Sequence, residues 1–371
     1  MRFRDFKLER YFDEWEFAAR ILLGSSDPES MRLPELLALA DDDSRRRWDE
    51  LWLGYTESPG LPALREAVAA GFDTCGPEEI LVFSAPEEAI FHVASAVLEP
   101  GDQMVGITPA YQSSYEVPRS AGAQITLVPL RADRGWTLDL DEFADAVTGR
   151  TKLIYVNFPH NPTGGVLSAA QQRRLVEIAD SCGAYLFSDE VYRGLELDPA
   201  DQLPAAADLY PRAISLGGLS KAYGLPGVRL GWIACRDAGL MQRILAAKDF
   251  TTICAAAPSE VLALIAVRAA DQLVGRSLAG IRRHVGLAAE FIDARPGMLR
   301  WVPPRAGSIC FPELLLDMPV SEFCRRLVSE REVLLVPAEM FEVDGNHFRL
   351  GLGRANLPEG LRELGEFLAG F

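Results

Sequence analysis

The feature that most constrains the fold of this chain is an alternation of short apolar runs with helical patterns between residues 80 and 234. Amphipathic stretches lie between the apolar runs, and one of them, 168–182, opens with a Ser-x-x-Gln capping box. Strands that alternate with helices predict an α/β fold, with a mostly parallel sheet covered by helices on both faces. Seven runs are the predicted strands: 80–83, 104–107, 124–129, 153–157, 185–188, 213–216 and 230–234.

The length of 371 residues is enough for one large and one smaller domain. Residues 256–283 have the pattern of a long helical connector, and residues 297–371 that of a smaller α+β unit. We therefore predict three parts. An N-terminal segment, 1–40, packs with the small domain; the large domain spans 41–265; the connector helix and the small domain span 266–371.

Composition excludes some classes of partner. The formal net charge is −16, from 53 acidic against 37 basic residues, which argues against nucleic acid or an anionic membrane. An acidic balance also suits a cationic substrate, although a solvated acidic surface is the commoner cause. The six cysteines and four histidines show no metal-ligand spacing, so we predict no metal site and a reducing, cytoplasmic location. The sequence shows neither a signal peptide nor a membrane-spanning run.

Polar residues follow four of the predicted strands at the point where each strand ends. They are Ser84, the segments 157–164 and 189–192, and Lys221. In a parallel sheet such ends meet at one edge, where ligands bind in this class of fold. The sequence therefore predicts a site at that edge.

Lys221 lies in a glycine-rich segment, with Ser220 beside it and Arg229 eight residues beyond. These groups suit a cofactor that carries both an aldehyde and a phosphate. The amine condenses with the aldehyde, while the guanidinium makes forked hydrogen bonds to the phosphate. Pyridoxal phosphate is such a cofactor. For the lysine alone, the alternative is a surface residue in a glycine-rich turn.

Two other segments supply partners for such a ring. Asp189 ends an apolar strand, where a buried carboxylate needs a partner such as a protonated pyridine nitrogen. Tyr192 could reach the phenolic oxygen, and the rigid turn 157–164 can aim the Asn161 amide at a ring oxygen. A helix N-cap is the alternative for Asp189, and a turn without a ligand is the alternative for Asn161.

Three strings together resemble the class I/II aminotransferases, which are fold-type I pyridoxal-phosphate enzymes. They are Asn-x-Pro-x-Asn-Pro-Thr-Gly at 157–164, Ser-Asp-Glu-x-Tyr at 188–192 and Ser-Lys-x-x-x-x-x-Gly-x-Arg-x-Gly at 220–231. The resemblance covers nearly the whole chain. It implies a three-layer large domain with a seven-stranded sheet and a smaller α+β domain. It also implies that Lys221 holds the cofactor as a Schiff base and then shuttles the α-proton of an amino acid substrate.

By position, the resemblance places five residues on the cofactor. Asp189 would pair with the pyridine nitrogen, and Asn161 and Tyr192 would contact the phenolic oxygen. Ser220 and Arg229 would hold the phosphate.

Further residues take roles from the same resemblance. Tyr111 would stack on the ring, and Tyr55 would reach the phosphate from a neighbouring subunit, which implies a homodimer. Arg349 would clamp the α-carboxylate of the substrate, with Asn161 and Ser26 as further substrate-binding residues. Core or turn packing is the alternative for each tyrosine alone, and a surface salt bridge is the alternative for Arg349.

The phosphate-binding part departs from the family pattern. Gly218 stands where Ser or Thr usually binds the phosphate, and Ser84-Ala85-Pro86 stands where a Gly-Ala-like pair usually opens a helix. Because Pro86 has no backbone N–H, this helix N-terminus offers the phosphate one donor fewer. We predict cofactor binding at Ser84, Ala85 and Pro86 that is intact but weaker.

Residues 9–17 and 24–30 are similar to the branch of the family that contains capreomycidine synthase. Members of that branch cyclise arginine-derived amino acids in specialised metabolism. Asp27, Glu29 and Glu57 could receive a cationic side chain in such a site, although exposed loop charges are the commoner outcome.

The resemblance leaves more than one function open. The main prediction is transamination between an α-amino acid and a 2-oxo acid. The alternative is elimination, replacement or ring closure at the side chain, which shares Cα deprotonation by Lys221 and differs in where the electrons then go. A cofactor-sensing domain of a transcription regulator is a third class, which we disfavour because no helix-turn-helix precedes the fold.

Overall fold

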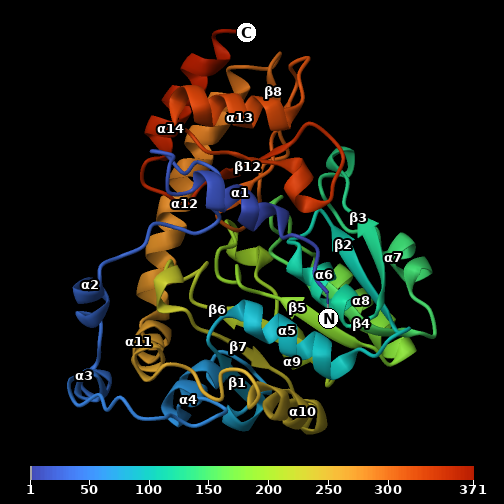
Figure 1. Ribbon diagram of the computed structural model, residues 1–371, viewed down its shortest axis with the longest axis vertical. Coiled ribbons are helices and arrows are strands. Elements are labelled where there is room, and N and C mark those ends of the chain that lie inside the picture. The colour runs from blue at the N-terminus through green and yellow to red at the C-terminus, as the bar shows by residue number, and fades with distance from the viewer. Residues whose placement is uncertain (1) are drawn as a thin grey trace.

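The structure, a computed structural model, describes residues 2–371. A large part with a central sheet lies below a smaller part, and the long helix α12 (Ala270–Asp293) joins them (Figure 1). Helix α1 (Lys7–Trp15) lies between the two parts.

A seven-stranded sheet forms the middle layer of the large part, in the order β1-β7-β6-β5-β4-β2-β3. Strand β7 is antiparallel to both of its neighbours, and the other adjacent strands pair in parallel. The prediction of a mostly parallel, seven-stranded sheet is confirmed. The strands are β1 (Ile80–Phe83), β2 (Gln103–Thr108), β3 (Gln124–Pro129), β4 (Thr151–Asn157), β5 (Tyr185–Asp189), β6 (Ala213–Gly218) and β7 (Gly231–Ala234).

Helices cover both faces of the sheet because successive strand residues point to opposite sides. In β1, Leu81 and Phe83 pack with α5 (Pro86–Val97) and α10 (Ala238–Lys248), together with α6 (Ser113–Ser120). Ile80 and Val82 pack on the other side with α4 (Pro62–Ala69) and α11 (Ala257–Arg268). The remaining helices on that side are α7 (Leu140–Ala146), α8 (Ala169–Cys182) and the short α9 (Ala206–Leu209). The result is the three-layer arrangement expected of this fold class.

Two helix predictions have different outcomes. The capping box of α8 is present: the Ser168 hydroxyl accepts from the Gln171 amide, and the Gln171 side chain accepts from the Ser168 amide. The single connector predicted at 256–283 is wrong, because Ala269 has a non-helical backbone and divides it into α11 and α12. The two helices have different partners: α11 packs on α4 under the sheet, whereas α12 rises to α14 in the smaller part.

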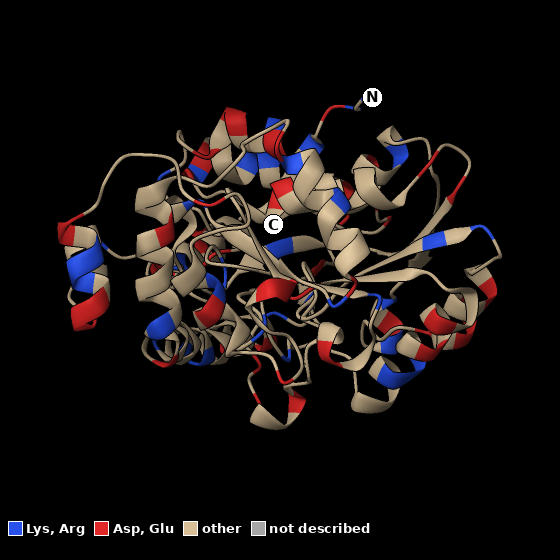
Figure 2. Ribbon diagram, turned by 90° about the horizontal axis from the view of Figure 1, so that it is seen from below, with Lys and Arg blue, Asp and Glu red and all other residues tan. Residues whose placement is uncertain are grey.

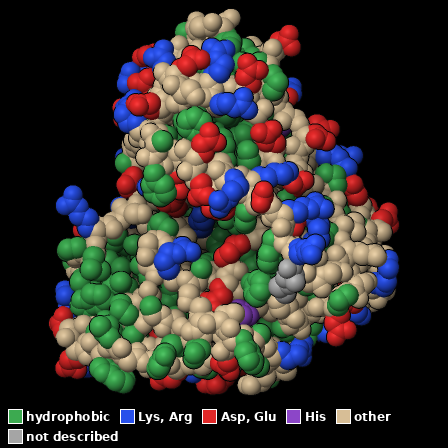
Figure 3. Space-filling view, in the orientation of Figure 1, with side chains coloured by type: hydrophobic (Ala, Val, Ile, Leu, Met, Phe, Trp, Pro, Cys, Tyr) green, Lys and Arg blue, Asp and Glu red, His purple; other side chains and the backbone are tan. Residues whose placement is uncertain are grey.

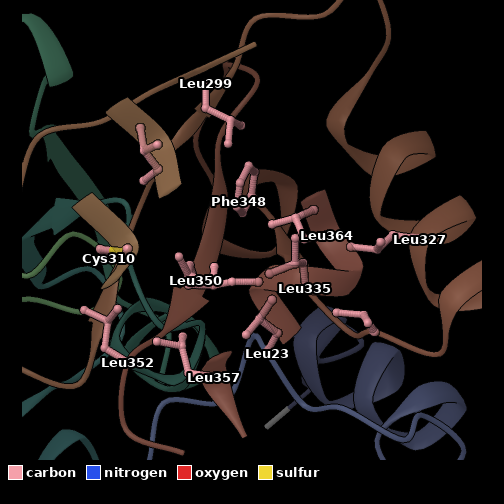
Figure 4. Close-up of a cluster of buried hydrophobic side chains, with 14 of the residues drawn as sticks. Leu23, Leu299, Cys310, Leu327, Leu335, Phe348, Leu350, Leu352, Leu357 and Leu364 are labelled. Carbon is pink, nitrogen blue, oxygen red and sulfur yellow. The ribbon is translucent and has the colours of Figure 1, made fainter. Parts of the chain in front are cut away.

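The smaller part contains two short sheets and two helices. The sheets are β11 (Val336–Pro337)–β12 (Phe348–Gly351)–β9 (Ile309–Cys310) and β10 (Glu313–Leu314)–β8 (Leu299–Arg300), and the helices are α13 (Val320–Arg331) and α14 (Leu357–Leu368). Leu23 of the N-terminal segment lies in its core beside Leu335, Leu350 and Leu364 (Figure 4). The boundaries at residues 40 and 265 stay predictions.

The N-terminal segment ends after α2 (Leu33–Leu37), and α3 (Asp42–Asp49) follows it at the edge of the molecule. Acidic and basic residues are mixed over the outer helices (Figure 2). Within residues 2–371, no helix combines the length and the apolar character that crossing a membrane requires.

Candidate active site

A cavity of about 600 Å³ lies where β4, β5 and β6 end, with α1 on its opposite side. Figure 3 shows the molecule hollowed between its two parts, with acidic side chains at the hollow. The structure brings most of the predicted site residues to its wall: Ser26, Pro86, Tyr111, Asn161, Asp189, Tyr192, Ser220, Lys221, Arg229 and Arg349. Residues from position 26 to position 349 therefore meet in one space.

Ser84 and Ala85 do not line this cavity, although the sequence placed them on the cofactor. Tyr55 does not line it either, in keeping with its expected role in the site of a neighbouring subunit. The Ser84 amide is engaged, because it donates to Glu88 Oε2 at 2.8 Å. The Tyr55 side chain is 85% exposed on the outside of the chain. The helix N-terminus that begins at Pro86 is thus poorer in free donors than the sequence suggested.

Lys221 follows the end of β6, and its Nζ donates to Ser26 Oγ at 2.7 Å. Burial lowers the pKa of Lys221 to about 8. A substantial fraction of the amine is therefore neutral near physiological pH. The neutral form is the one that can attack an aldehyde or accept a proton.

Asp189 is held at the end of β5 by contacts from two sides. Tyr155 Oη donates to its Oδ2 at 3.3 Å, and the Val191 amide donates to its Oδ1 at 3.2 Å. Burial raises the pKa of Asp189 to about 6, and no lysine or arginine of residues 2–371 forms a salt bridge with it. A carboxylate at such a position is stabilised by a cationic partner.

The donor set fits pyridoxal phosphate. A protonated ring nitrogen would supply the cation that Asp189 lacks. The Tyr192 hydroxyl is buried and makes no hydrogen bond of normal geometry to the described residues, so it is available to a ring oxygen. The Asn161 carbonyl accepts from Arg349, which leaves its Nδ2 free for the same purpose. Lys221 would hold the aldehyde carbon, and Arg229 and Ser220 would hold the phosphate.

At the phosphate end, the two departures from the family pattern occupy the same space. A Cβ added to Gly218 would lie 2.6 Å from Pro86 Cγ, and one added to Gly231 would lie 2.8 Å from the same ring. Arg229, which lies between these glycines in the chain, has a left-handed backbone with φ of 54°. The Pro86 ring therefore fills the room that a serine or threonine at position 218 would need.

Arg349 comes from β12 and is 1% exposed. Its Nε donates to the Gly24 carbonyl at 2.9 Å, and its Nη1 donates to Asn161 Oδ1 at 3.3 Å. Its guanidinium carbon lies 5.3 Å from the Phe341 ring centre and 6.0 Å from that of Phe12. Because a guanidinium has five N–H donors, several remain for a carboxylate.

Sequence reasoning missed three acidic residues of the wall, Glu9, Glu16 and Glu87. Glu9 Oε1 accepts from Tyr111 Oη at 2.9 Å. Glu9, Phe12 and Glu16 have the i, i+3, i+7 spacing of one helix face, and this signal could have placed both acids together.

Of the three acidic residues that the sequence suggested for a cationic substrate, one lines the cavity and two do not. Asp27 lies on the wall and accepts from Arg354 Nη2 at 2.7 Å. Glu29 lies off the wall and accepts from the Ala355 amide, and Glu57 is also off the wall. Of the three acids, Asp27 is therefore the one that can meet a ligand in this cavity.

Comparison with known proteins shows the family of the chain. The family pattern of aminotransferase class I and II matches residues 19–364. Capreomycidine synthase of Streptomyces vinaceus is 32% identical over 366 residues, which cover 97% of this chain and 93% of that protein.

Two solved structures are similar over the full chain. A pyridoxal-phosphate-dependent aminotransferase from Streptococcus suis has a TM-score of 0.94 at 30% identity, covering 100% of this chain and 99% of the other. The pyridoxal-phosphate-dependent cyclase OrfR has a TM-score of 0.91 at 29% identity, covering 100% and 98%. The chain therefore belongs to the aminotransferase class I and II family, and its cofactor is pyridoxal 5′-phosphate.

Proposed function

We propose that this enzyme removes the α-proton of a cationic α-amino acid and transfers the amino group to a 2-oxo acid. The cofactor, when bound, withdraws electrons from the substrate's Cα. Lys221 takes the α-proton, since its amine is buried in the cavity and neutral in large part near pH 8. Asp189 maintains the charge of the cofactor ring.

The observation that carries this proposal is the placement of Arg349 and Lys221 in one cavity. Arg349 is fully buried, and its Nη2 group makes no hydrogen bond to a described residue. A bidentate contact with a carboxylate would use these donors and would fix the direction of the Cα–H bond. An α-amino acid has the carboxylate and the acidic Cα–H that such a pair requires.

The cationic character of the substrate is supported by three carboxylates of the N-terminal segment, Glu9, Glu16 and Asp27. Burial raises the pKa of Glu16, and the charges of Asp27 and Glu9 raise it further. Negative charge is thus concentrated on one side of the cavity, with Arg354 as the partner of Asp27. A guanidinium or ammonium on the substrate side chain would offset the rest.

Ring closure is the second candidate, and the similarity to capreomycidine synthase and to the cyclase OrfR favours it. In that reaction, the electrons released by α-deprotonation expel a leaving group from the substrate side chain. A side-chain nitrogen then adds to the carbon that lost this group, which closes the ring, and Cα regains a proton. Lys221 and Arg349 would act as in transamination until that point.

Labelled substrate separates the two reactions. We would incubate the holoenzyme with α-¹⁵N amino acids, with and without a 2-oxo acid, and follow the label by mass spectrometry. Transfer of the label to the 2-oxo acid supports transamination. Retention of the label in a cyclic product supports ring closure. The absence of both, and of solvent exchange at Cα, would overturn the proposal.

The charge of the substrate is tested with Glu9→Gln and Glu16→Gln, and with Glu14→Gln as the control. Glu14 lies on the exposed side of the same helix. We expect each cavity variant to lower kcat/KM for arginine by about tenfold, which corresponds to roughly 1.4 kcal/mol. For citrulline, the neutral isostere, the change should be small. Equal losses for the two substrates would exclude recognition of the cation.

We also infer that the enzyme is a homodimer in which Tyr55 completes the partner's site. Trp52, Leu53, Tyr55 and Phe250 are each at least 79% exposed, and this apolar edge is what a second copy would cover. Figure 3 shows a broad hydrophobic area on this side of the molecule, beside α2, α3 and α4. A cytoplasmic location is supported by the six free cysteines.

A further inference from the structure

Glu87 places a carboxyl group in the cofactor cavity, at the end that suits a phosphate. It lies in the first turn of α5, and it lines the cavity together with Ser220 and Arg229. Protein surrounds the side chain, but its surface stays accessible from the cavity. None of the roles described so far uses this residue.

The surroundings of Glu87 are poor in positive charge. The pKa of Glu87 is raised to about 7, and burial is the main cause. The Ser113 hydroxyl and Arg229 lower the pKa, whereas the carboxylates Asp189 and Glu9 raise it. The groups that face it come from helix α1 and from the large part: Glu9 from α1, Tyr111 and Ser113 near the start of α6, Tyr155 from β4, Asp189 from β5, and Arg229 between β6 and β7.

The N-terminus of α5 has few free N–H donors with which to stabilise both the Glu87 carboxylate and a phosphate. The first amides of a helix and its dipole favour one negative group. Here Pro86 has no N–H, and the Ser84 amide is already bound by Glu88. A phosphate dianion bound at Arg229 would therefore meet the ionised form of Glu87 with little positive charge between them.

We propose that Glu87 takes up a proton when the cofactor's phosphate binds, so that cofactor affinity is coupled to protonation of this carboxyl group. The proton comes from solvent and remains on a Glu87 oxygen, and no other bond changes. Glu87 is a positioning residue in this proposal, because it acts through the charge that it presents to the phosphate.

The test uses the apo-protein and pyridoxamine 5′-phosphate, which has no aldehyde and does not react with Lys221. Its affinity would be measured by fluorescence from about pH 6 to about pH 9 for the wild type and Glu87→Gln. Above pH 7, we expect the wild-type affinity to fall relative to Glu87→Gln by up to tenfold per pH unit. Near pH 6, the two proteins should bind equally.

Two controls test whether the pH dependence of the affinity requires both Glu87 and the phosphate group. Glu14→Gln removes an exposed carboxyl group outside the cavity and should keep the wild-type pH profile. Pyridoxamine, which lacks the phosphate, should bind the wild type and Glu87→Gln with parallel pH profiles. Parallel profiles for pyridoxamine 5′-phosphate itself would overturn the proposal, and so would weaker binding to Glu87→Gln at every pH.

A measurement on the wild type alone covers the case in which the variant does not fold. Calorimetry of pyridoxamine 5′-phosphate binding in buffers of different ionisation enthalpy counts the protons exchanged. Near pH 8, uptake approaching one proton more than for pyridoxamine supports the proposal. No additional uptake would contradict it.

Discussion

Pro86, Gly218 and Gly231 form one packing unit behind the phosphate site. The distances of 2.6 and 2.8 Å from their hypothetical Cβ atoms to the proline ring are too short for any side chain. A proline at 86 and a glycine at 218 are therefore tolerated together, although each alone departs from the family pattern. Because Pro86 has no N–H and Gly218 has no hydroxyl, the phosphate has fewer hydrogen-bond donors. This is the physical reason for the predicted weaker cofactor binding.

This coupling predicts a non-additive pair of substitutions. Gly218→Ser alone should lower the free energy of unfolding by about 1–3 kcal/mol, because the new side chain overlaps the proline ring. In a Pro86→Ala background the same change should be nearly neutral, and cofactor affinity should rise because an N–H and a hydroxyl become available. Urea unfolding and cofactor titration of the four proteins measure the coupling. Simple additivity would show that the two positions are independent.

The catalytic lysine and its neighbours were predictable because they lie in short strings whose spacing is fixed by local backbone geometry. Lys221, Asp189 and Asn161 each follow a strand, and the sheet then brings them to one edge. Glu9 and Glu87 were missed because their roles depend on contacts between distant parts of the chain. Glu9, for example, meets Tyr111 across 102 residues.

Helix α1 closes the cavity by contacts with both parts of the molecule. The Lys7 amide donates to Gln112 Oε1 at 2.9 Å in the large part, and Tyr11 Oη donates to the Leu335 carbonyl at 2.9 Å in the smaller part. Phe12 lies over the Arg349 guanidinium from the cavity side. The helix therefore shields the Arg349 guanidinium from water.

Replacement of Phe12 by alanine should weaken substrate binding and leave cofactor binding intact. Loss of the ring exposes Arg349 to water and removes a cation–π contact worth about 0.5–2 kcal/mol. We expect KM for the amino acid to rise by roughly tenfold. The matched control is Phe17→Ala, since Phe17 follows the same helix and is 94% exposed. An equal rise in KM for both variants would mean that the ring acts through general stability.

The strands were predicted to within about two residues because buried parallel strands are continuous apolar runs bounded by turns. The break between α11 and α12 at Ala269 was not predicted, because the residues on both sides of it have a helical sequence pattern. Only the different packing partners of α11 and α12 make the chain turn there. Short strands such as β8 and β9, of two residues each, lack any periodicity from which they could be identified.

A buried lysine links the two loops of the exposed apolar edge, which is formed by Trp52, Leu53, Tyr55 and Phe250. Lys248 is fully buried, and its Nζ donates to the carbonyls of Ser58 and Ile253 at 2.7 and 2.8 Å. It thereby joins the loop that carries Tyr55 to the loop that carries Phe250. Both loops present their large apolar side chains outward, as expected of a surface that pairs with a second copy.

Mixing a variant that lacks the catalytic amine with one that is expected to bind the cofactor weakly tests whether the two subunits share their active sites. Lys221→Ala lacks the reactive amine, and Tyr55→Phe lacks the hydroxyl that would reach the partner's phosphate. Subunits exchanged between the two should form heterodimers in which one site is fully wild type. Activity should then approach one wild-type site per heterodimer. Failure of the mixture to exceed the sum of its components, despite confirmed exchange, would place Tyr55 outside the partner's site.

The residues that line the cavity come from positions 6 to 354 of the chain. On the ribosome, Lys221 and the central sheet emerge long before β12, which carries Arg349. A nascent chain therefore has no closed cavity until nearly all of it has been synthesised. A truncated or stalled product would lack the complete pocket that encloses the cofactor's reactive aldehyde.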